Sequence, residues 1–340
     1  MHQLSDPDRI DVPEAPLIPG LVFRHFRGES DYPDMVRIAN DRAAANGDAL
    51  NLTLEEVRHE YAHLTNSNPA TDMLFAEVDE EMVGYWRGQW RDNADGNRIY
   101  GIALWLHPAW HGRGISHAAL LWMEDRLRQI AADHDPERPK LFQGYATQGN
   151  RHQAELLEAH GYQPVRHFYT MVRPTLDDIP DFPLPEGLEV RPVLPEQYRA
   201  IWDADVEAFR DAWSFGEPDE EDYQRWLGNK TTFQPALWQV AWDVATNQIA
   251  GQVQTFIDHA ENERFGRRRG YTENISVRRP YRRRGLARAL IARSLRAQRE
   301  AGMTASTLGV DSDSPTGASR VYEECGFRVT QTATLYRKAL

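Results

Sequence analysis

The stretch ENISVRRPYRRRGLARAL, residues 273–290, combines a carboxylate, a run of cations and a glycine. The residues up to Val277 alternate as those of a strand do, and a helix is predicted from Gly285 onward. The first N–H groups of a helix have no intrahelical partners and lie at the positive end of its dipole, so a strand–loop–helix junction of this kind binds pyrophosphate. Flanking arginines add charge for further phosphates. The segment therefore predicts a site for a phosphate-bearing cofactor.

The residues of this predicted cradle come from the end of the strand, the loop and the first helical turn. They are Ile275, Ser276, Val277, Arg282, Arg283, Arg284, Gly285, Leu286 and Ala287. Glycine and alanine leave room for a ligand to approach the backbone. A solvated surface or a nucleic-acid patch is the competing interpretation, but few aromatic residues are interleaved with the arginines, which weakens single-strand binding. The position between strand and helix favours coenzyme phosphates.

A second motif points to different chemistry, because His59 and His63 form the H-E-x-x-H pattern of zinc metalloproteases. At 100° per residue both histidines fall on the helix face opposite Val57, whereas a catalytic zinc needs its ligands in a cleft together with a third protein ligand. The corresponding helix in the second half of the chain, around 219–227, has no histidine. We therefore expect no metal site.

The elements that position these residues occur twice. GLVFRHF at Gly20 matches GLEVRPV at Gly187, and the glycine–helix junctions at Gly114 and Gly285 lie 171 residues apart. LLEAHGY matches VYEECGF 165 residues later. Three matches in the same order indicate an internal duplication. The proline-rich and acidic segment 174–187 between the copies is typical of a linker.

Each copy predicts an opening strand, two helices, three strands, a glycine-led helix, a further strand, a short helix and a final hairpin. This order favours an α+β class, with a mixed sheet between helical layers in a three-layer α/β/α arrangement. The copies correspond to two domains, over residues 1–176 and 185–340.

Composition narrows the functional classes. The net charge of −12 argues against general affinity for nucleic acid, although residues 264–296 hold twelve arginines and a single acid. The first twenty residues lack a signal-peptide pattern, and no long apolar run predicts a membrane span. The single cysteine, Cys325, suits a reducing compartment. We expect a cytoplasmic protein.

The second copy resembles a known family. R-x-x-G-x-A after a strand, followed by GVDSDSPTGASRVYEECGF at 309–327, is similar to the acetyl-CoA signature of the GNAT N-acetyltransferases. The resemblance covers both halves and implies two tandem GNAT domains, the architecture of mycothiol synthase and its relatives. It implies acetyl-CoA as cosubstrate and direct acetyl transfer to a primary amine, most simply of a small molecule, with a peptide or protein amine as the alternative.

The resemblance also implies roles for individual residues. Transfer needs a base for the attacking ammonium and an acid for the departing thiolate. Tyr322 stands at the family's acid position. Glu273 lies on the strand two residues beyond Tyr271, where the family often has its glutamate, and both positions share a strand face. Ser314 stands where relatives often have asparagine and completes the cofactor-binding set.

The first copy departs from this pattern. Its possible cofactor-binding residues are Leu104, Trp105, Leu106, His111, Gly112, Arg113, Gly114, Ile115 and Ser116. However, Leu157 and Ile102 replace Tyr322 and Glu273, and neither side chain can move a proton. We therefore expect catalysis in the second copy and a degenerate site in the first.

Three questions stay open at this point. The acids of residues 217–222 can attract a cationic amine or merely cap a helix, and Trp213, Phe215, Tyr223 and Trp226 can form an apolar wall for the acceptor. A non-catalytic acyl-CoA-binding sensor is the alternative to an enzyme. The duplication can supply within one chain the pairing of a dimer, so we expect a monomer or a dimer.

Overall fold

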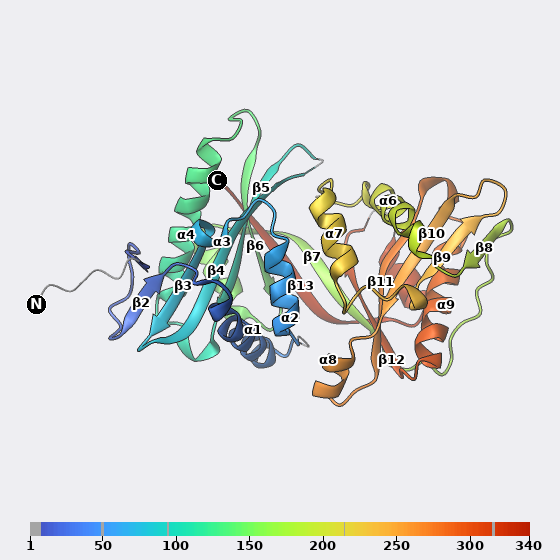
Figure 1. The fold of residues 1–340 in the computed structure, drawn as a ribbon, viewed down its shortest axis with the longest axis horizontal. Coiled ribbons are helices and arrows are strands. Elements are labelled where there is room, and N and C mark those ends of the chain that lie inside the picture. Colours follow the sequence, from blue (N-terminus) through green and yellow to red (C-terminus); the bar gives the residue numbers. More distant parts are fainter. Residues whose placement is uncertain (1–7, 49–50, 94, 214, 315–316) are drawn as a thin grey trace, which may run out of the picture. The chain divides into compact units, whose positions relative to one another are not determined.

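The computed structural model describes residues 8–48, 51–93, 95–213, 215–314 and 317–340. Residues 1–7 of the polar N-terminus lie outside the described part. The chain forms two compact units (Figure 1). Unit 1 comprises the residues up to Val165 together with Ala333–Leu340, and unit 2 comprises Arg166–Thr332.

Unit 1 contains a mixed sheet with the strand order β1-β2-β3-β4-β5-β6-β13. Neighbouring strands are antiparallel except β5 and β6, which are parallel. The strands are β1 (Arg9–Ile10), β2 (Leu21–Arg24), β3 (Met73–Val78), β4 (Glu81–Asp92), β5 (Arg98–Leu106), β6 (Lys140–Thr147) and β13 (Arg328–Ala339). The α-helices are α1 (Tyr32–Asn46), α2 (Leu54–Ala62), α3 (Pro69–Asp72), α4 (Ile115–Ala132) and α5 (Arg151–Ala159).

Unit 2 repeats this arrangement with the strand order β7-β12-β11-β10-β9-β8, and here β11 and β12 are the parallel pair. The strands are β7 (Gln163–Arg173), β8 (Leu188–Arg191), β9 (Gln239–Asp243), β10 (Ile249–Phe256), β11 (Arg269–Val277) and β12 (Ala305–Asp311). The α-helices are α6 (Tyr198–Phe209), α7 (Glu220–Gly228), α8 (His259–Arg264), α9 (Leu286–Glu300) and α10 (Ala318–Glu324).

Alternating burial places an apolar layer on each face of the sheet of unit 1. Leu74 of β3 packs in one cluster with Met123 of α4, whereas its neighbour Phe75 packs in another with Met35 of α1. Successive strand residues point to opposite faces, so one strand serves both layers. Unit 2 has two corresponding clusters, one of which includes Leu290 of α9 and the other Ile201 of α6. The predicted α+β class with helical layers around a mixed sheet is confirmed.

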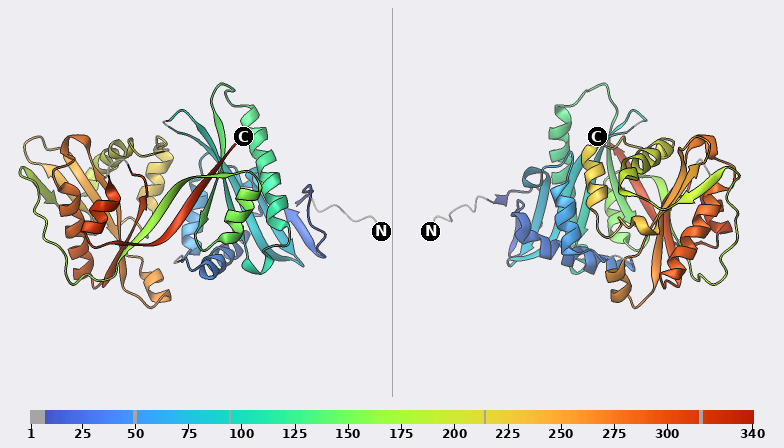
Figure 2. Two further views of the ribbon diagram at one scale, coloured as in Figure 1. Left: turned by 180° about the vertical axis from the view of Figure 1, so that it is seen from behind. Right: turned by 45° about the vertical axis from the view of Figure 1, so that its right-hand side comes forward.

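The compact units differ from the sequence copies at their last strands. β7, from the end of the first copy, pairs antiparallel with β12 from Ser306↔Arg173 to Asp311↔Phe168, a pairing visible in Figure 2. β13, from the end of the second copy, pairs with β6 from Ala333↔Thr147 to Ala339↔Leu141. The expected final hairpin in each copy is replaced by one long strand that completes the other unit. Because the copies share a pattern, the last strand of either can pair with the same neighbour.

Candidate active site

Two parallel strands separate in the middle of unit 2. β11 and β12 pair only from Arg269↔Ala305 to Tyr271↔Thr307, yet β11 continues to Val277 and β12 to Asp311. A bulge in β11 follows, where Asn274 adopts a φ of 45° and the register with β10 shifts. Bulges bend a strand and re-aim its side chains. The result is a fork whose inner backbone groups have no partner strand.

Glu273 lies at this fork. Its Oε1 accepts a hydrogen bond from the Gly309 N–H of β12 at 3.1 Å. Burial raises the pKa of Glu273 to about 7, and the bond from Gly309 opposes that rise only in part. Desolvation disfavours the charged form of a carboxyl group, and a pKa near the working pH is what a general base requires.

Tyr322 of α10 is the second protic group at the fork. Its side chain is buried, and burial raises the pKa of its phenol, to which the negative charge of Glu273 adds. The phenol therefore stays protonated at neutral pH and can donate its proton. The structure thus brings together the two residues that the sequence analysis expected to form a base and an acid.

The predicted phosphate cradle begins α9. Gly285 stands at the N-cap with a φ of 85°, a left-handed conformation that glycine adopts without strain, and no side chain caps the helix. A Cβ at Gly285 would meet only Arg288 Nη2, at 3.5 Å, among the described atoms within 4 Å. The first-turn N–H groups of Leu286 and Ala287 have no partner within the helix, and the Leu286 side chain is buried in the core.

The arginines of the cradle are held in different ways. Arg282 donates from Nε to Val277 O at 2.9 Å, from Nη1 to Asp211 Oδ2 at 2.5 Å and from Nη2 to Ala208 O at 3.0 Å. Arg279 and Arg282 together hold the pKa of Asp211 well below its usual range. Arg283 and Arg284 are exposed. Arg284 Nη2 donates to Glu186 O at 2.9 Å, so Arg282 and Arg284 each have a partner in the protein, while Arg283 and Arg284 remain exposed to an anion from solvent.

The other predicted cofactor-binding residues of unit 2 also lie around the fork. Ile275 and Val277 are partly buried against the core of unit 2. Ser276 is buried, and Ser314 donates its N–H to Asp311 O at 3.2 Å in the turn after β12.

The corresponding junction of unit 1 has a segment from near the N-terminus beside it. Gly114 begins α4 with a φ of 86°, but a Cβ there would lie 3.3 Å from Pro16 Cβ. Glu14 Oε2 lies 2.8 Å from Nε2 of His117 in the first turn of α4. A segment near the N-terminus therefore lies beside this junction, where Gly114 itself is exposed, and places its own carboxylate next to the first turn of α4.

Two further cradle residues of unit 1, His111 and Ser116, contact His152. His111 stacks on His152 with centroids 4.1 Å apart, and burial lowers the pKa of His111 to about 4, so this ring is neutral. Ser116 Oγ lies 3.2 Å from His152 Nε2. Gly112 and Gly114 both have positive φ.

The fork of unit 1 has an apolar interior. β5 and β6 pair from Arg98↔Lys140 to Gly101↔Gln143 and then separate. A Cβ on Gly144, which corresponds to Gly309, would lie 2.8 Å from the side chain of the fully buried Leu157. Ile102 is buried in the same cluster as Leu104 and Leu106. Trp105 stacks on Tyr85 on the other face, with centroids 4.6 Å apart.

The acidic segment before α7 is paired within the protein. Asp219 caps α7 by accepting from Asp222 N at 2.9 Å, Glu217 pairs with Arg210 at 2.6 Å, and Glu220 pairs with Arg199 at 2.6 Å. A cavity of about 530 Å³ lies between this segment and α6, and neither Glu273 nor Tyr322 lines it. Capping therefore accounts for Asp219, and ion pairs with arginines account for Glu217 and Glu220.

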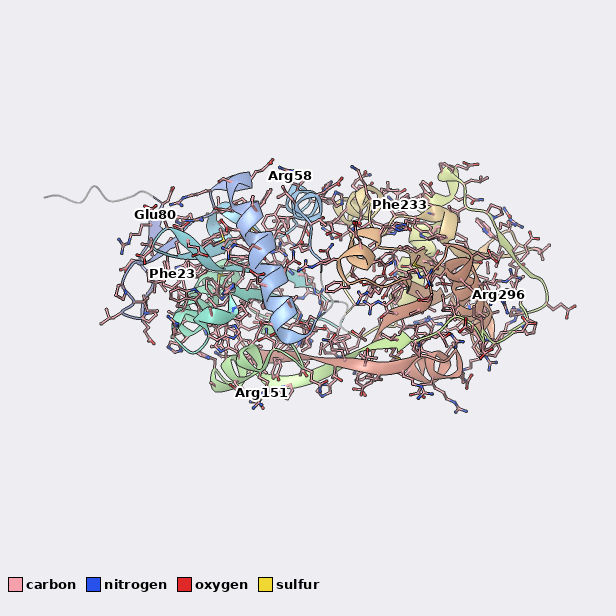
Figure 3. The ribbon with its side chains drawn as sticks, turned by 90° about the horizontal axis from the view of Figure 1, so that it is seen from below. Phe23, Arg58, Glu80, Arg151, Phe233 and Arg296 are labelled. Carbon is pink, nitrogen blue, oxygen red and sulfur yellow. The ribbon has the colours of Figure 1, made fainter. Side chains whose placement is uncertain are left out.

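The predicted aromatic wall is present in part. Trp226 of α7 packs on Phe233, labelled in Figure 3, with ring centroids 4.9 Å apart, and on Trp238 at 5.3 Å. Tyr223 lies 5.8 Å from Trp226, and Trp213 carries Arg166 over its ring.

Several residues at the site were not found from the sequence. Gly309 donates its N–H to Glu273, and Asp211 accepts from Arg282. Each of these bonds joins segments far apart in the chain. Asp205 of α6 is a further buried carboxyl, whose pKa burial raises to about 6 against hydrogen bonds from Gln252 and Ser276. Gln252 and Gln254 alternate with apolar residues on β10. Such polar side chains in an otherwise apolar strand were the sequence signal that could have pointed to this part of the site.

The H-E-x-x-H helix is α2. His63 Nδ1 lies 2.7 Å from His59 O, and the two rings are 4.6 Å apart. Over residues 8–340, apart from the short undescribed gaps, no three His, Cys, Asp or Glu side chains are grouped as metal ligands. In the same part of the chain, no helix combines the length and apolar character needed to cross a bilayer.

Comparisons with known proteins agree with this geometry. The family model described as "Acetyltransferase (GNAT) family" matches residues 36–135 and 198–327, together more than half of the chain. Mycothiol acetyltransferase of Pseudarthrobacter chlorophenolicus is 27% identical over 277 residues, which cover 78% of this chain and 75% of that protein.

Solved structures show the same fold. A GCN5-related N-acetyltransferase from Sphaerobacter thermophilus is 25% identical with a TM-score of 0.72, and the match covers 95% of this chain and 96% of that one. A tandem GNAT protein from the clavulanic acid biosynthesis pathway has a TM-score of 0.68 at 14% identity and covers 94% of this chain and 98% of its own. The chain belongs to the GNAT acetyltransferase family and carries two GNAT domains in tandem.

Proposed function

We propose that the protein is an acetyl-CoA-dependent N-acetyltransferase in which only the second copy catalyses, with the primary amine of a small molecule as acceptor. The observation that carries this proposal is the pair at the fork of unit 2. A carboxyl whose pKa is raised to about 7 lies within electrostatic reach of a buried phenol whose pKa is also raised. These are the protonation states that a base and an acid need.

Each residue has a defined task. Acetyl-CoA supplies a thioester whose carbonyl carbon accepts the amine. Glu273 receives the proton that the acceptor ammonium loses, which frees the nitrogen lone pair for attack. The C–N bond forms and the C–S bond breaks, the Tyr322 hydroxyl protonates the departing sulfur, and the second proton that the attacking nitrogen loses restores the Tyr322 hydroxyl. The N-terminus of α9 and the exposed Arg283 and Arg284 bind the phosphates.

The first copy is proposed to bind no coenzyme. Pro16 lies against Gly114, and Glu14 places a negative charge beside the first turn of α4, where it competes with a phosphate. Leu157 fills the fork beside Gly144. Pro16 and Leu157 therefore oppose coenzyme binding by their bulk, and Glu14 opposes it by its charge.

The choice of a small-molecule acceptor is supported by the relative named mycothiol acetyltransferase. Of the expected aromatic wall, Tyr223 and Trp226 lie with ring centroids 5.8 Å apart, which suits a compact acceptor with apolar carbon. Substrate identity beyond an amine is to be found with a panel of small-molecule amines and peptides, followed by detection of the released thiol.

The same assay tests the proposal. Thiol release with at least one amine, lost in Tyr322→Phe and kept in Tyr336→Phe, supports an enzyme that works in the second copy. Tyr336 is a suitable control because it is also a buried tyrosine, and its hydroxyl donates to Glu158 in unit 1. Tight coenzyme binding without thiol release for any amine would instead favour a sensor.

A further inference from the structure

Gln254 lies directly opposite Glu273 across the β10–β11 pair. Its Oε1 accepts two hydrogen bonds, from Trp226 Nε1 at 3.0 Å and from Asn274 Nδ2 at 2.9 Å. An indole N–H can only donate, so the amide oxygen must face Trp226. The orientation of the amide is therefore fixed by its neighbours, and its NH₂ group points away from them.

That NH₂ group is a buried donor without an acceptor. Gln254 is 4% exposed, and its Nε2 has no hydrogen-bond partner among the described residues. Buried donors are almost always satisfied in folded proteins, and an exception calls for a functional explanation or an ordered water. Turning the amide around would place NH₂ against the indole N–H and satisfy neither group.

Glu273 has a carboxylate oxygen that accepts no hydrogen bond from the described residues. Its Oε1 is bonded to the Gly309 N–H, while no bond to its Oε2 is seen from the described residues. Directly opposite residues of an antiparallel pair have Cβ atoms about 4.5–5.5 Å apart on one face of the sheet. The side chains of Gln254 and Glu273 therefore start side by side on one face of the sheet, and no direct bond joins them among the described residues.

We propose that Gln254 is a positioning residue that holds the water through which Glu273 takes the proton of the acceptor ammonium. The water oxygen accepts from Gln254 Nε2, and one of its hydrogens bonds to Glu273 Oε2. As the ammonium N–H bond breaks, its proton passes to the water oxygen, and the water passes its own proton to Glu273. The carboxylate becomes neutral and the amine gains its lone pair. This inference rests on the proposed function.

Other groups around Glu273 have to be considered for the pH dependence. Gly309 of β12 contributes an N–H, Trp226 of α7 contacts the oxygen end of Gln254, and both are neutral. Tyr322 of α10 is the titratable group that faces Glu273, and its pKa lies above the working range. Asp205 of α6, whose pKa burial raises to about 6, is bonded to Gln252 rather than to Gln254, so the carboxyl band lost in Glu273→Gln is needed to separate the Glu273 midpoint from that of Asp205.

The experiment compares Gln254→Met with Gln252→Met in the full-length protein. Gln252 is a buried glutamine on the same strand face, but its Nε2 is already bonded to Asp205 at 2.8 Å. Gln254→Met should lower kcat about 10-fold or more, since general base catalysis is typically worth about 10²–10⁴-fold. It should also raise the pH midpoint of kcat/KM, because the carboxylate loses a hydrogen bond, and should leave acetyl-CoA affinity unchanged. Gln252→Met should leave that midpoint in place.

A second measurement does not depend on turnover. Infrared titration of the carboxyl band that disappears in Glu273→Gln reports the protonation of Glu273 directly, and its midpoint should also rise in Gln254→Met. A folded Gln254→Met protein with unchanged midpoint overturns the proposal even if kcat falls. If the wild type releases no thiol with any amine, the proposed function fails, and the infrared midpoint still decides the role of Gln254.

Should Gln254→Met fail to fold, Gln254→Glu keeps an acceptor for Trp226 and Asn274 while removing the donor. It should fold, lose activity and raise the Glu273 midpoint further, because a second carboxylate opposes ionisation. A Gln254→Glu protein with wild-type kcat and midpoint would equally overturn the proposal.

Discussion

At the scale of single residues, Glu273 links activity to pH. A base must be ionised, so kcat/KM should rise with pH through a midpoint of about 7. Glu273→Gln should remove this limb and most of the activity. A steady-state pH profile from 5 to 9 checks this, and an unchanged limb in Glu273→Gln would assign it to another group.

Glu273 should also reduce stability at alkaline pH. Its pKa is raised from 4.5 in the unfolded chain to about 7 in the fold, so the folded state binds the proton more tightly. The free energy of unfolding therefore falls as pH rises between these values and stays low above them. At pH 8 Glu273→Gln should be more stable than the wild type by about 1–3 kcal/mol. Urea unfolding at pH 4 and pH 8 measures the difference, which should disappear at pH 4.

At the scale of elements, the turn before α9 should bind the coenzyme through its open N-terminus. Gly285→Val should abolish acetyl-CoA binding, measured by calorimetry, because the side chain would fill the space of the pyrophosphate. Gly302→Val is the matched control. Gly302 also has a positive φ, of 87°, with no described atom near its missing Cβ, and it lies beyond the other end of α9. Equal loss of binding in both variants would indicate backbone strain rather than a blocked site.

The elements also show what the sequence could predict. The strand–loop–helix junction at Gly285 follows from local pattern and glycine chemistry, and the positions of Tyr322 and Glu273 followed from the resemblance. The exchange of β7 and β13 could not be predicted, because the two copies share one pattern and the local sequence does not say which copy a last strand will join. The approach of Pro16 to Gly114 and the bond from Gly309 to Glu273 join segments far apart in the chain, and no local pattern encodes such contacts.

At the scale of the whole molecule, two copies should give one working site. Pro16 and Glu14 lie beside the junction at Gly114, whereas a Cβ at Gly285 would meet only Arg288 among the described atoms, and this difference predicts one acetyl-CoA per chain, measured by calorimetry or native mass spectrometry. Two equivalent binding events would show that Pro16 and Glu14 are readily displaced. Light scattering should show a monomer or a dimer, and a stable trimer or hexamer would contradict the expected pairing of the copies within one chain.

The most direct test of the central claim, that the second copy alone transfers the acetyl group, is the turnover of Tyr322→Phe at saturating acetyl-CoA and amine. The variant keeps the ring and loses the proton donor. We expect a kcat about 10²–10⁴-fold below wild type with unchanged coenzyme affinity, and normal turnover for the control Tyr336→Phe. A folded Tyr322→Phe enzyme with wild-type kcat would contradict it.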